Sequence, residues 1–462
     1  MNLFRTKSIA NLQSLAKDSG LKKTLTALDL ICLGVGCVIG TGIFVLTGVA
    51  AAEYAGPAVS LSFLLSGIVC AFVALAYAEF ASMIPTAGSA YTYTYTALGE
   101  IVAFICGWNL LLEYMLATSA VASGWGGYVA GLFKAAGFAL PQAITAVPAE
   151  GGLMNLPAIL ILAFLCLLLI RGTSESATVN RILVFVKLAA IFIFLVLAGP
   201  NIEPTNWEPF MPFGWAGVSA GAAIAFFAFI GFDAVATSAE ECRNPGRDLP
   251  IGIVGSLIVC TILYIAVSAT LTGVVPYPLL DNAEPVAFAL RYIGYNIGSA
   301  LVAVGAIAGI TTVLLVLLYA LARVVFAMSR DGMLPPAICK IHPTFKTPYR
   351  VTIIGATVAG IGAGFFPIGL IAEMVNIGTL SAFFIACIGV LVLRFTRPNA
   401  PRKFRCPGLV IIAPLAAISC AYLMYNLPTD TWIRFFVWTA LGFVTYFAYS
   451  YRHSKLGKGE SN

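Results

Sequence analysis

The sequence predicts an all-α membrane protein with twelve transmembrane helices. Of its 462 residues, 60% are hydrophobic and only 10% are charged, whereas a soluble domain carries about 25% charged residues. The apolar residues form long continuous runs, unlike the alternating segments of a transmembrane β-barrel. Because the chain has too few polar residues to cover a water-soluble surface, we expect membrane lipids to surround it.

The expected spans follow one another with short connections. They cover residues 27–50, 57–83, 98–130, 154–170, 177–198, 215–240, 251–275, 287–328, 351–366, 370–393, 407–426 and 431–451. We divide the chain into an amino-terminal tail (1–26), a first five-helix repeat (27–198), a second five-helix repeat (199–393), helices eleven and twelve (394–451) and a carboxy-terminal tail (452–462). The division into two repeats depends on interruptions in spans one and six.

The distribution of basic residues predicts the orientation. Lysine and arginine concentrate in the tails and in connections of one side, at residues 5–23, 243–247, 330–350, 394–405 and 452–458. The opposite side offers little beyond Lys134, Arg291 and Arg434. Basic connections of membrane proteins face the cytoplasm, so we expect a multi-pass protein of the cell membrane with both termini cytoplasmic. The net charge of +6 is then a consequence of topology and does not indicate a nucleic-acid partner.

Several kinds of chemistry lack the residues that they need. The eleven cysteines avoid the predicted outer loops and form no CxxC pair, so we expect no structural disulfides. The two histidines, His342 and His453, lie outside the spans, and the sequence contains no GxxxxGK[ST] phosphate-binding loop. We therefore expect no metal site, no cofactor, no enzymatic activity and no ATP-driven pumping by this chain.

The first span contains four glycines within "GVGCVIGTGIF" (34–44). A dinucleotide-binding loop would need a preceding strand and a βαβ unit, for which this span has no room. Close helix packing can explain Gly34 and Gly36, but Gly40 and Gly42 lie two residues apart on different helix faces. The third interpretation is a discontinuous helix. In a bilayer, such unwinding occurs where the freed backbone lines a cavity or binds a ligand.

A broken helix suits a ligand that carries a positive and a negative charge close together. Freed amides at the start of a half-helix bind an anionic group, and freed carbonyls bind a cation or an ammonium group. An amino acid has both groups on one carbon. A second interruption occurs in the sixth span, "FFAFIGFD" (226–233), at Gly231 and Asp233. Paired interruptions predict two inverted five-helix repeats, spans one to five and six to ten, with spans eleven and twelve as additions.

Four segments together resemble the amino acid–polyamine–organocation (APC) superfamily. They are "GVGCVIGTGIF" (34–44), "PTAGSAYTYTYTALGEIVAFICGWNLLLEY" (85–114), "AEECRNPGRDLPIGI" (239–253) and "SRDGMLP" (329–335). Within the superfamily, the chain is most similar to the twelve-span bacterial members of the cationic amino acid transporter (CAT) family. The resemblance implies a leucine-transporter-type fold with helices one and six broken, and an L-amino acid as the substrate. A small membrane subunit remains open as a further partner.

The two breaks then form the expected substrate site. The resemblance places the substrate carboxylate on the amides of the first break and the α-ammonium on carbonyls of both breaks. One phenyl ring of the second break is expected to cover the bound amino acid. The expected substrate-binding residues of the breaks are Ile39, Gly40, Thr41, Gly42, Ile43, Phe227, Ala228, Phe229 and Ile230.

Lys187 lies about ten residues into the fifth span, roughly 15 Å deep at 1.5 Å per residue. From there its side chain reaches the interface poorly, and an ion inside the membrane is by default a functional residue. The resemblance implies that its ammonium contacts the broken first helix, where related sodium-coupled carriers hold a sodium ion. Burial favours neutral lysine, so we expect Lys187 to couple transport to protons.

Three acidic residues receive different roles. The resemblance places Glu113 of the third span near the substrate cavity, whereas the alternative is a buried acid satisfied by the hydroxyls of Tyr114 or Thr118. Asp233 is expected to cap or orient the half-helix that follows the second break, and not to contact the substrate. Glu79, near the cytoplasmic end of span two, is expected to belong to a gate or interface network.

These residues predict a secondary active transporter for proton-coupled uptake of L-amino acids. A channel is the remote alternative, because no filter sequence or ring of polar pore residues is visible. Alignment of span eight places Leu317 towards the pocket, where its bulk shortens the cavity. This favours small neutral amino acids such as alanine. Arginine or lysine is the alternative, with Glu113 as the acceptor of the cationic side chain.

Overall fold

The computed structural model describes residues 3–9, 25–84, 89–172, 177–238, 242–345 and 347–459. Most of the basic amino-terminal tail and parts of the segments 85–114 and 239–253 lie outside these ranges. Within them the chain is helical, and the β-structure consists of one isolated parallel bridge between Leu25 and Cys242. The predicted all-α class is confirmed.

Helical segments cover all twelve expected spans. Expected spans one to six correspond to α2 (Ala27–Val38) with η1 (Gly42–Leu46), α3 (Thr47–Val49) and η2 (Ala50–Ala55), to α4 (Val59–Met83), α6 (Glu100–Ala135), α8 (Leu156–Ile170) and α9 (Ala177–Ala198), and to α10 (Gly214–Ala225) with η7 (Phe226–Phe229) and α11 (Ala234–Thr237). Spans seven to twelve correspond to α12 (Pro245–Val274), α14 (Asn296–Arg330), α15 (Tyr349–Phe365), α16 (Ile368–Thr396), α17 (Leu409–Tyr425) and α18 (Thr429–Thr445) with η10 (Tyr446–Ser450) and α19 (Tyr451–His453). Connecting segments add η3 (Gly56–Ala58), α5 (Ser89–Ala97), α7 (Gln142–Thr145), η4 (Pro148–Glu150), η5 (Gly199–Asn201), η6 (Pro204–Trp207), η9 (Tyr277–Leu280), α13 (Pro285–Tyr292) and η11 (Leu456–Lys458).

Length and composition identify the candidate membrane spans. In the described part of the chain, seven helical runs are long and apolar enough to cross a membrane. The pair Leu409–Tyr425 and Thr429–His453 passes the same test only when taken together, with a bend of 115° between the two helices. Three shorter apolar helices are α2, α8 and α15. These helices make the protein a multi-span membrane protein, whereas the count of twelve spans and the inverted repeat stay predictions.

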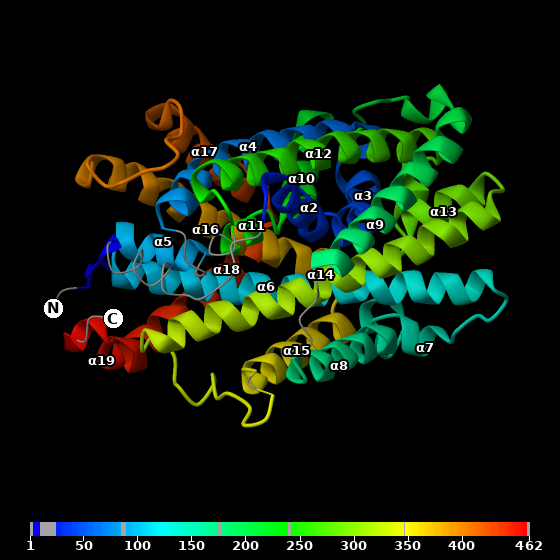
Figure 1. Cartoon of the computed structure of the whole chain (residues 1–462). Helices are drawn as coiled ribbons and strands as arrows, with labels where there is room; N and C mark the ends of the chain where they lie inside the picture. Colours follow the sequence, from blue (N-terminus) through cyan, green and yellow to red (C-terminus); the bar gives the residue numbers. More distant parts are fainter. Residues whose placement is uncertain are drawn as a thin grey trace.

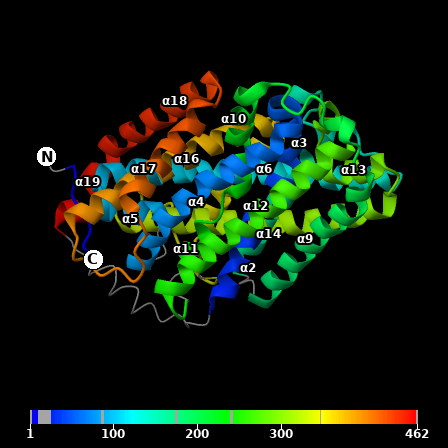
Figure 2. The same ribbon diagram turned by 90° about the horizontal axis from the view of Figure 1, so that it is seen from above.

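The helices run roughly along one axis of the molecule, and both chain ends lie at the same end of it (Figure 1). The most extensive packing joins α14 to α6 and α12 to α4, and the second pair is seen side by side in Figure 2. Lys7 of the amino-terminal segment forms an ion pair with Asp331, 2.5 Å apart, just beyond α14. The Ser454 hydroxyl donates to Glu100 of α6 over 2.6 Å.

Glycine permits close packing of α2 against α12. A Cβ on Gly34 would lie 2.5 Å from the Ser256 hydroxyl oxygen and 3.0 Å from Val235. Real side-chain atoms do not approach this closely, so Gly34 is required by helix packing. The packing explanation therefore holds for Gly34, while the unwinding of the helix begins five residues later.

Candidate functional site

The first predicted interruption is confirmed. Helix α2 ends at Val38, Ile39 adopts an extended backbone (φ −75°, ψ 105°), and the chain re-enters a helix as the π-helical turn η1 at Gly42. The last carbonyls of α2 therefore lack the amide partners that a continuous helix would supply. They carry the partial negative charge of a helix carboxy terminus.

The second interruption has a different geometry. Helix α10 tightens into the 3₁₀ segment η7, Ile230 is extended, and Gly231 has a φ of +112° before α11 begins. This positive φ favours glycine. A Cβ on Gly231 would lie 3.1 Å from the Cys37 carbonyl oxygen. The second break thus touches the first.

Of the two roles expected for Asp233, capping of the half-helix is wrong, whereas Asp233 is absent from the cavity lining, in line with the expectation that it does not contact the substrate. Asp233 precedes α11, but its side chain makes no capping hydrogen bond to the helix. Its carboxylate instead accepts a hydrogen bond from the Tyr114 hydroxyl of α6, 3.1 Å away. The hydrogen bond to Tyr114 directs the side chain to α6 and not to the start of the short half-helix.

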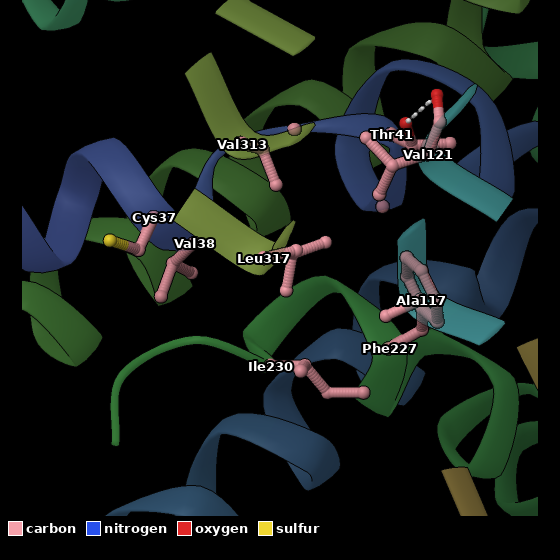
Figure 3. Close-up of a pocket in the computed structure, with 11 residues that line it drawn as sticks. Cys37, Val38, Thr41, Ala117, Val121, Phe227, Ile230, Val313 and Leu317 are labelled. Atoms are coloured by element: carbon pink, nitrogen blue, oxygen red, sulfur yellow. Dashed lines mark hydrogen bonds between the residues drawn. The ribbon is translucent and has the colours of Figure 1, made fainter. Parts of the chain in front are cut away.

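A small cavity of about 20 Å³ lies where the two breaks meet α6 and α14. Its lining consists of Cys37, Val38, Gly40, Thr41, Gly42, Ala117, Val121, Phe227, Ile230, Val313 and Leu317. Figure 3 shows Val313 and Leu317 of α14 beside this space, with Phe227 and Ile230 of the second break on another side. The Thr41 hydroxyl donates to the Val121 carbonyl over 3.3 Å and so ties the first break to α6 (Figure 3).

The structure brings six of the predicted substrate-binding residues to this cavity: Gly40, Thr41, Gly42, Phe227, Ile230 and Leu317. The other predicted residues pack around it. Ile39 and Ala228 direct their carbonyls to other side chains, Ile43 accepts from the Thr47 hydroxyl over 2.9 Å, and the Phe229 ring packs on Tyr264. The lining side chains are uncharged, so the polar groups of the site come mainly from the backbone and Thr41.

Lys187 is fully buried and contacts the first break. Its ammonium donates to the carbonyls of Gly36 (2.6 Å) and Ile39 (3.0 Å) and to the Thr312 hydroxyl (3.2 Å). Gly309 of α14 makes room for it, because a Cβ there would lie 3.1 Å from the Lys187 Cβ. A protonated lysine has three N–H donors, and these three acceptors match them. The expected contact between Lys187 and the broken helix is present.

Glu113 is buried near Asp233 and Thr379, and it is absent from the cavity lining. The hydroxyls considered as its alternative partners have other acceptors. Tyr114 donates to Asp233, and Thr118 donates to the Tyr114 carbonyl over 2.6 Å. Glu113 lies one helical turn from Ala117 of the lining on the same face of α6, so it neighbours the site without forming its wall.

Glu79 belongs to a charged network, as expected. It is buried at the end of α4, pairs with Arg394, and accepts from Arg402 Nε over 3.1 Å and from the Cys406 amide over 2.8 Å. The network ties α4 to the end of α16 and to the segment between α16 and α17. It is separate from the substrate cavity.

Sequence reasoning missed five residues of the lining and one residue that joins the breaks. The missed lining residues are Cys37, Val38, Ala117, Val121 and Val313. A signal existed for three of them, since Ala117 and Val121 follow Glu113 at intervals of four residues and Val313 precedes Leu317 by four. The sixth residue, Tyr264, carries no signal in the sequence beyond its place in an apolar span.

Comparison with known proteins agrees with this architecture. The family model described as amino acid permease matches residues 25–446. The chain is 48% identical to the methylthioribose transporter of Bacillus subtilis, with 99% of this chain and 100% of the relative covered. It is also 48% identical to the branched-chain amino acid permease BcaP of the same organism, with 99% of each chain covered.

A plant protein is a more distant relative. The vacuolar cationic amino acid transporter 4 of Arabidopsis thaliana is 37% identical over 86% of this chain and 68% of its own length. The family match extends over nearly the whole chain and includes both helix breaks. The chain therefore belongs to the amino acid permease family of the amino acid–polyamine–organocation superfamily and is a membrane transporter, not an enzyme.

Proposed function

We propose that this protein is a secondary active transporter that takes up small neutral L-amino acids, such as alanine, together with protons. The contact between two broken helices around an uncharged cavity is the observation that supports this proposal most strongly. We further propose twelve spans with a five-plus-five inverted repeat in the cell membrane, and cytoplasmic termini. The position of both chain ends at one end of the molecule supports an even number of spans (Figure 1).

The backbone of the breaks offers groups for both charges of an α-amino acid. Gly40, Thr41 and Gly42 lie at the amino end of the helix that resumes with η1, where amides bind a carboxylate. The carbonyls of Ile39 and Ala228 each accept a hydrogen bond from a side chain. A carbonyl oxygen has two lone pairs, so each can also accept a bond from the α-ammonium group.

Two pairs of apolar residues form the walls for the substrate side chain. Ala117 and Val121 lie one turn apart on α6, and Val313 and Leu317 lie one turn apart on α14. The cavity of about 20 Å³ exceeds the minimum for a water molecule only slightly, so even alanine requires these walls to separate. Short apolar side chains need the smallest separation, which supports a small neutral substrate.

A branched-chain amino acid is the second candidate, because a relative with 48% identity carries that name. The apolar walls suit such a side chain once Leu317 moves. A dibasic substrate is less well supported, since the lining has no carboxylate and Glu113 lies behind it. Lys187 would also repel a second cation near the first break.

Purified protein in liposomes should accumulate labelled L-alanine when a proton gradient, acid outside, is imposed. Without the gradient we expect equilibration only. Unlabelled serine and glycine should compete strongly, leucine and valine more weakly, and arginine weakly. Equal uptake of alanine with and without the proton gradient would contradict proton coupling. Strong competition by arginine without competition by serine would assign the site to cationic substrates, and dominant competition by leucine would assign it to branched-chain substrates.

Leu317→Ser should admit longer side chains, because the change removes three carbon atoms from the cavity wall. We expect leucine or methionine to compete with alanine about tenfold better than in the wild type, which corresponds to about two buried methylene groups. Leu318→Ser is the matched control, since Leu318 is also buried on α14 but does not line the cavity. An unchanged competition profile in Leu317→Ser would exclude Leu317 from the specificity wall.

A further inference from the structure

Tyr264 reaches both helix breaks from a third helix. It lies on α12, its side chain is fully buried, and its ring packs against Phe63 of α4 and Phe229 of the second break. The ring centroids are 5.4 Å and 5.2 Å apart, respectively. The Phe63 and Phe229 rings also contact each other, with centroids 6.5 Å apart, so the three rings form one aromatic cluster. Packing in this cluster restricts the direction in which the Tyr264 side chain points.

The Tyr264 hydroxyl lies between two backbone carbonyls. It is 2.9 Å from the carbonyl oxygen of Val38, the last residue of α2, and 2.8 Å from that of Ala228 in η7. One carbonyl belongs to each break. Val38 also lines the substrate cavity, whereas Tyr264 does not. The hydroxyl therefore contacts the site through the backbone of a lining residue.

A single hydroxyl has only one proton to donate. With two acceptors at nearly equal distances, the proton is shared or alternates between them, and each carbonyl keeps the capacity for another donor. The carbonyls of Gly36 and Ile39 in the same break are bound by Lys187. Lys187 of α9 and Tyr264 of α12 thus bind neighbouring carbonyls of the first break. Tyr264 also binds a carbonyl of the second break.

We propose that Tyr264 is a positioning residue of the substrate site, whose hydroxyl holds the Val38 and Ala228 carbonyls at the separation that the α-amino acid group needs. This inference rests on the proposed function, since it treats the breaks as the site of the α-ammonium and carboxylate groups. The Ala228 carbonyl oxygen has a second lone pair, so it can accept a hydrogen bond from the ammonium group while Tyr264 stays in place between the two breaks.

Tyr264→Phe tests this role because it removes the hydroxyl and keeps the ring. Preorganised sites lose affinity when their groups become free to separate. We expect a Michaelis constant for L-alanine about tenfold higher than in the wild type, the usual effect of losing one buried hydrogen bond. The maximal rate per folded transporter should stay within about twofold. The measurement is exchange of labelled against unlabelled L-alanine in liposomes, with L-leucine as the second probe.

Tyr128→Phe is the matched control. Tyr128 is also fully buried, and its hydroxyl donates over 2.8 Å to the carbonyl of Phe44, in the same first span but beyond the break. Phe44 does not line the cavity. We expect a similar decrease in melting temperature for both variants, but an unchanged Michaelis constant for Tyr128→Phe.

A purely structural role of Tyr264 would lower the amount of folded protein and the maximal rate, and it would leave the Michaelis constant unchanged. That result, or an equal rise of the constant in Tyr128→Phe, would overturn the proposal. Exchange requires no gradient. If the wild type showed no proton coupling, the proposed coupling would be refuted, but the comparison of Tyr264→Phe with Tyr128→Phe would still test Tyr264. If the wild type exchanged neither alanine nor leucine, the proposed substrate class would be refuted, and the role of Tyr264 that rests on it would be refuted as well.

Discussion

Lys187→Ala is expected to abolish accumulation of alanine by a proton gradient, while alanine exchange continues. The protonated side chain has three N–H donors for the Gly36 and Ile39 carbonyls and the Thr312 hydroxyl. A neutral amine has only two donors. Loss of a proton is therefore expected to weaken the hold of Lys187 on the first break, and we propose that this change links proton release to the conformation of the substrate site. Alanine at this position has no proton to release.

Accumulation and exchange must be measured on the same liposomes. A variant that fails to fold loses both activities, whereas a variant that has lost coupling loses accumulation alone. Lys134→Ala is the control for removal of a lysine charge, because Lys134 is exposed at the end of α6. We expect it to match the wild type. Gradient-driven accumulation at the wild-type rate in Lys187→Ala would move the coupling role elsewhere, with Glu113 as the next candidate.

The features that the sequence predicted correctly depend on residues that are costly in a membrane helix. Gly40, Gly42 and Gly231 weaken a helix wherever they occur, and a mid-span lysine needs a partner. Such residues persist only where the fold uses them, so their positions indicated both breaks and the contact of Lys187 with the first. The resemblance to the superfamily depended on four segments, and one of these, 34–44, contains Gly40 and Gly42.

The cavity walls could not be predicted in the same way. Hydrophobic periodicity in a membrane helix does not distinguish a wall facing the cavity from one facing lipid. The signal for Ala117, Val121 and Val313 is therefore only their four-residue spacing from Glu113 and Leu317. Tyr264 is one of 18 tyrosines, and its importance depends on the distances from its hydroxyl to two carbonyls. For Asp233 the sequence predicted a local contact that the structure lacks. Its position before a half-helix suggested a cap, but its side chain accepts a tertiary hydrogen bond from Tyr114 instead.

The close approach of the two breaks makes Gly42 the most sensitive position of the site. A Cβ on Gly42 would lie 2.5 Å from the Cβ of Ala228 and would also meet the backbone of Ala228. Backbone atoms cannot rotate away as a flexible side chain can, so the breaks would have to separate. Gly42 and the neighbouring Gly40 and Thr41 also line the cavity where we place the substrate carboxylate.

Gly42→Leu should therefore reduce alanine binding below detection, at least about a thousandfold, because the larger side chain separates the breaks and fills the cavity. Gly42→Ala adds only the Cβ and should weaken binding about tenfold, in line with the cost of overpacking a close contact. Gly360→Leu is the control, since a Cβ on Gly360 of α15 meets nothing within 4 Å. Binding is measured by isothermal titration, with the melting temperature as the test of folding. If Gly42→Leu folds and binds alanine with wild-type affinity, the carboxylate does not bind at the first break and the substrate site must be placed elsewhere.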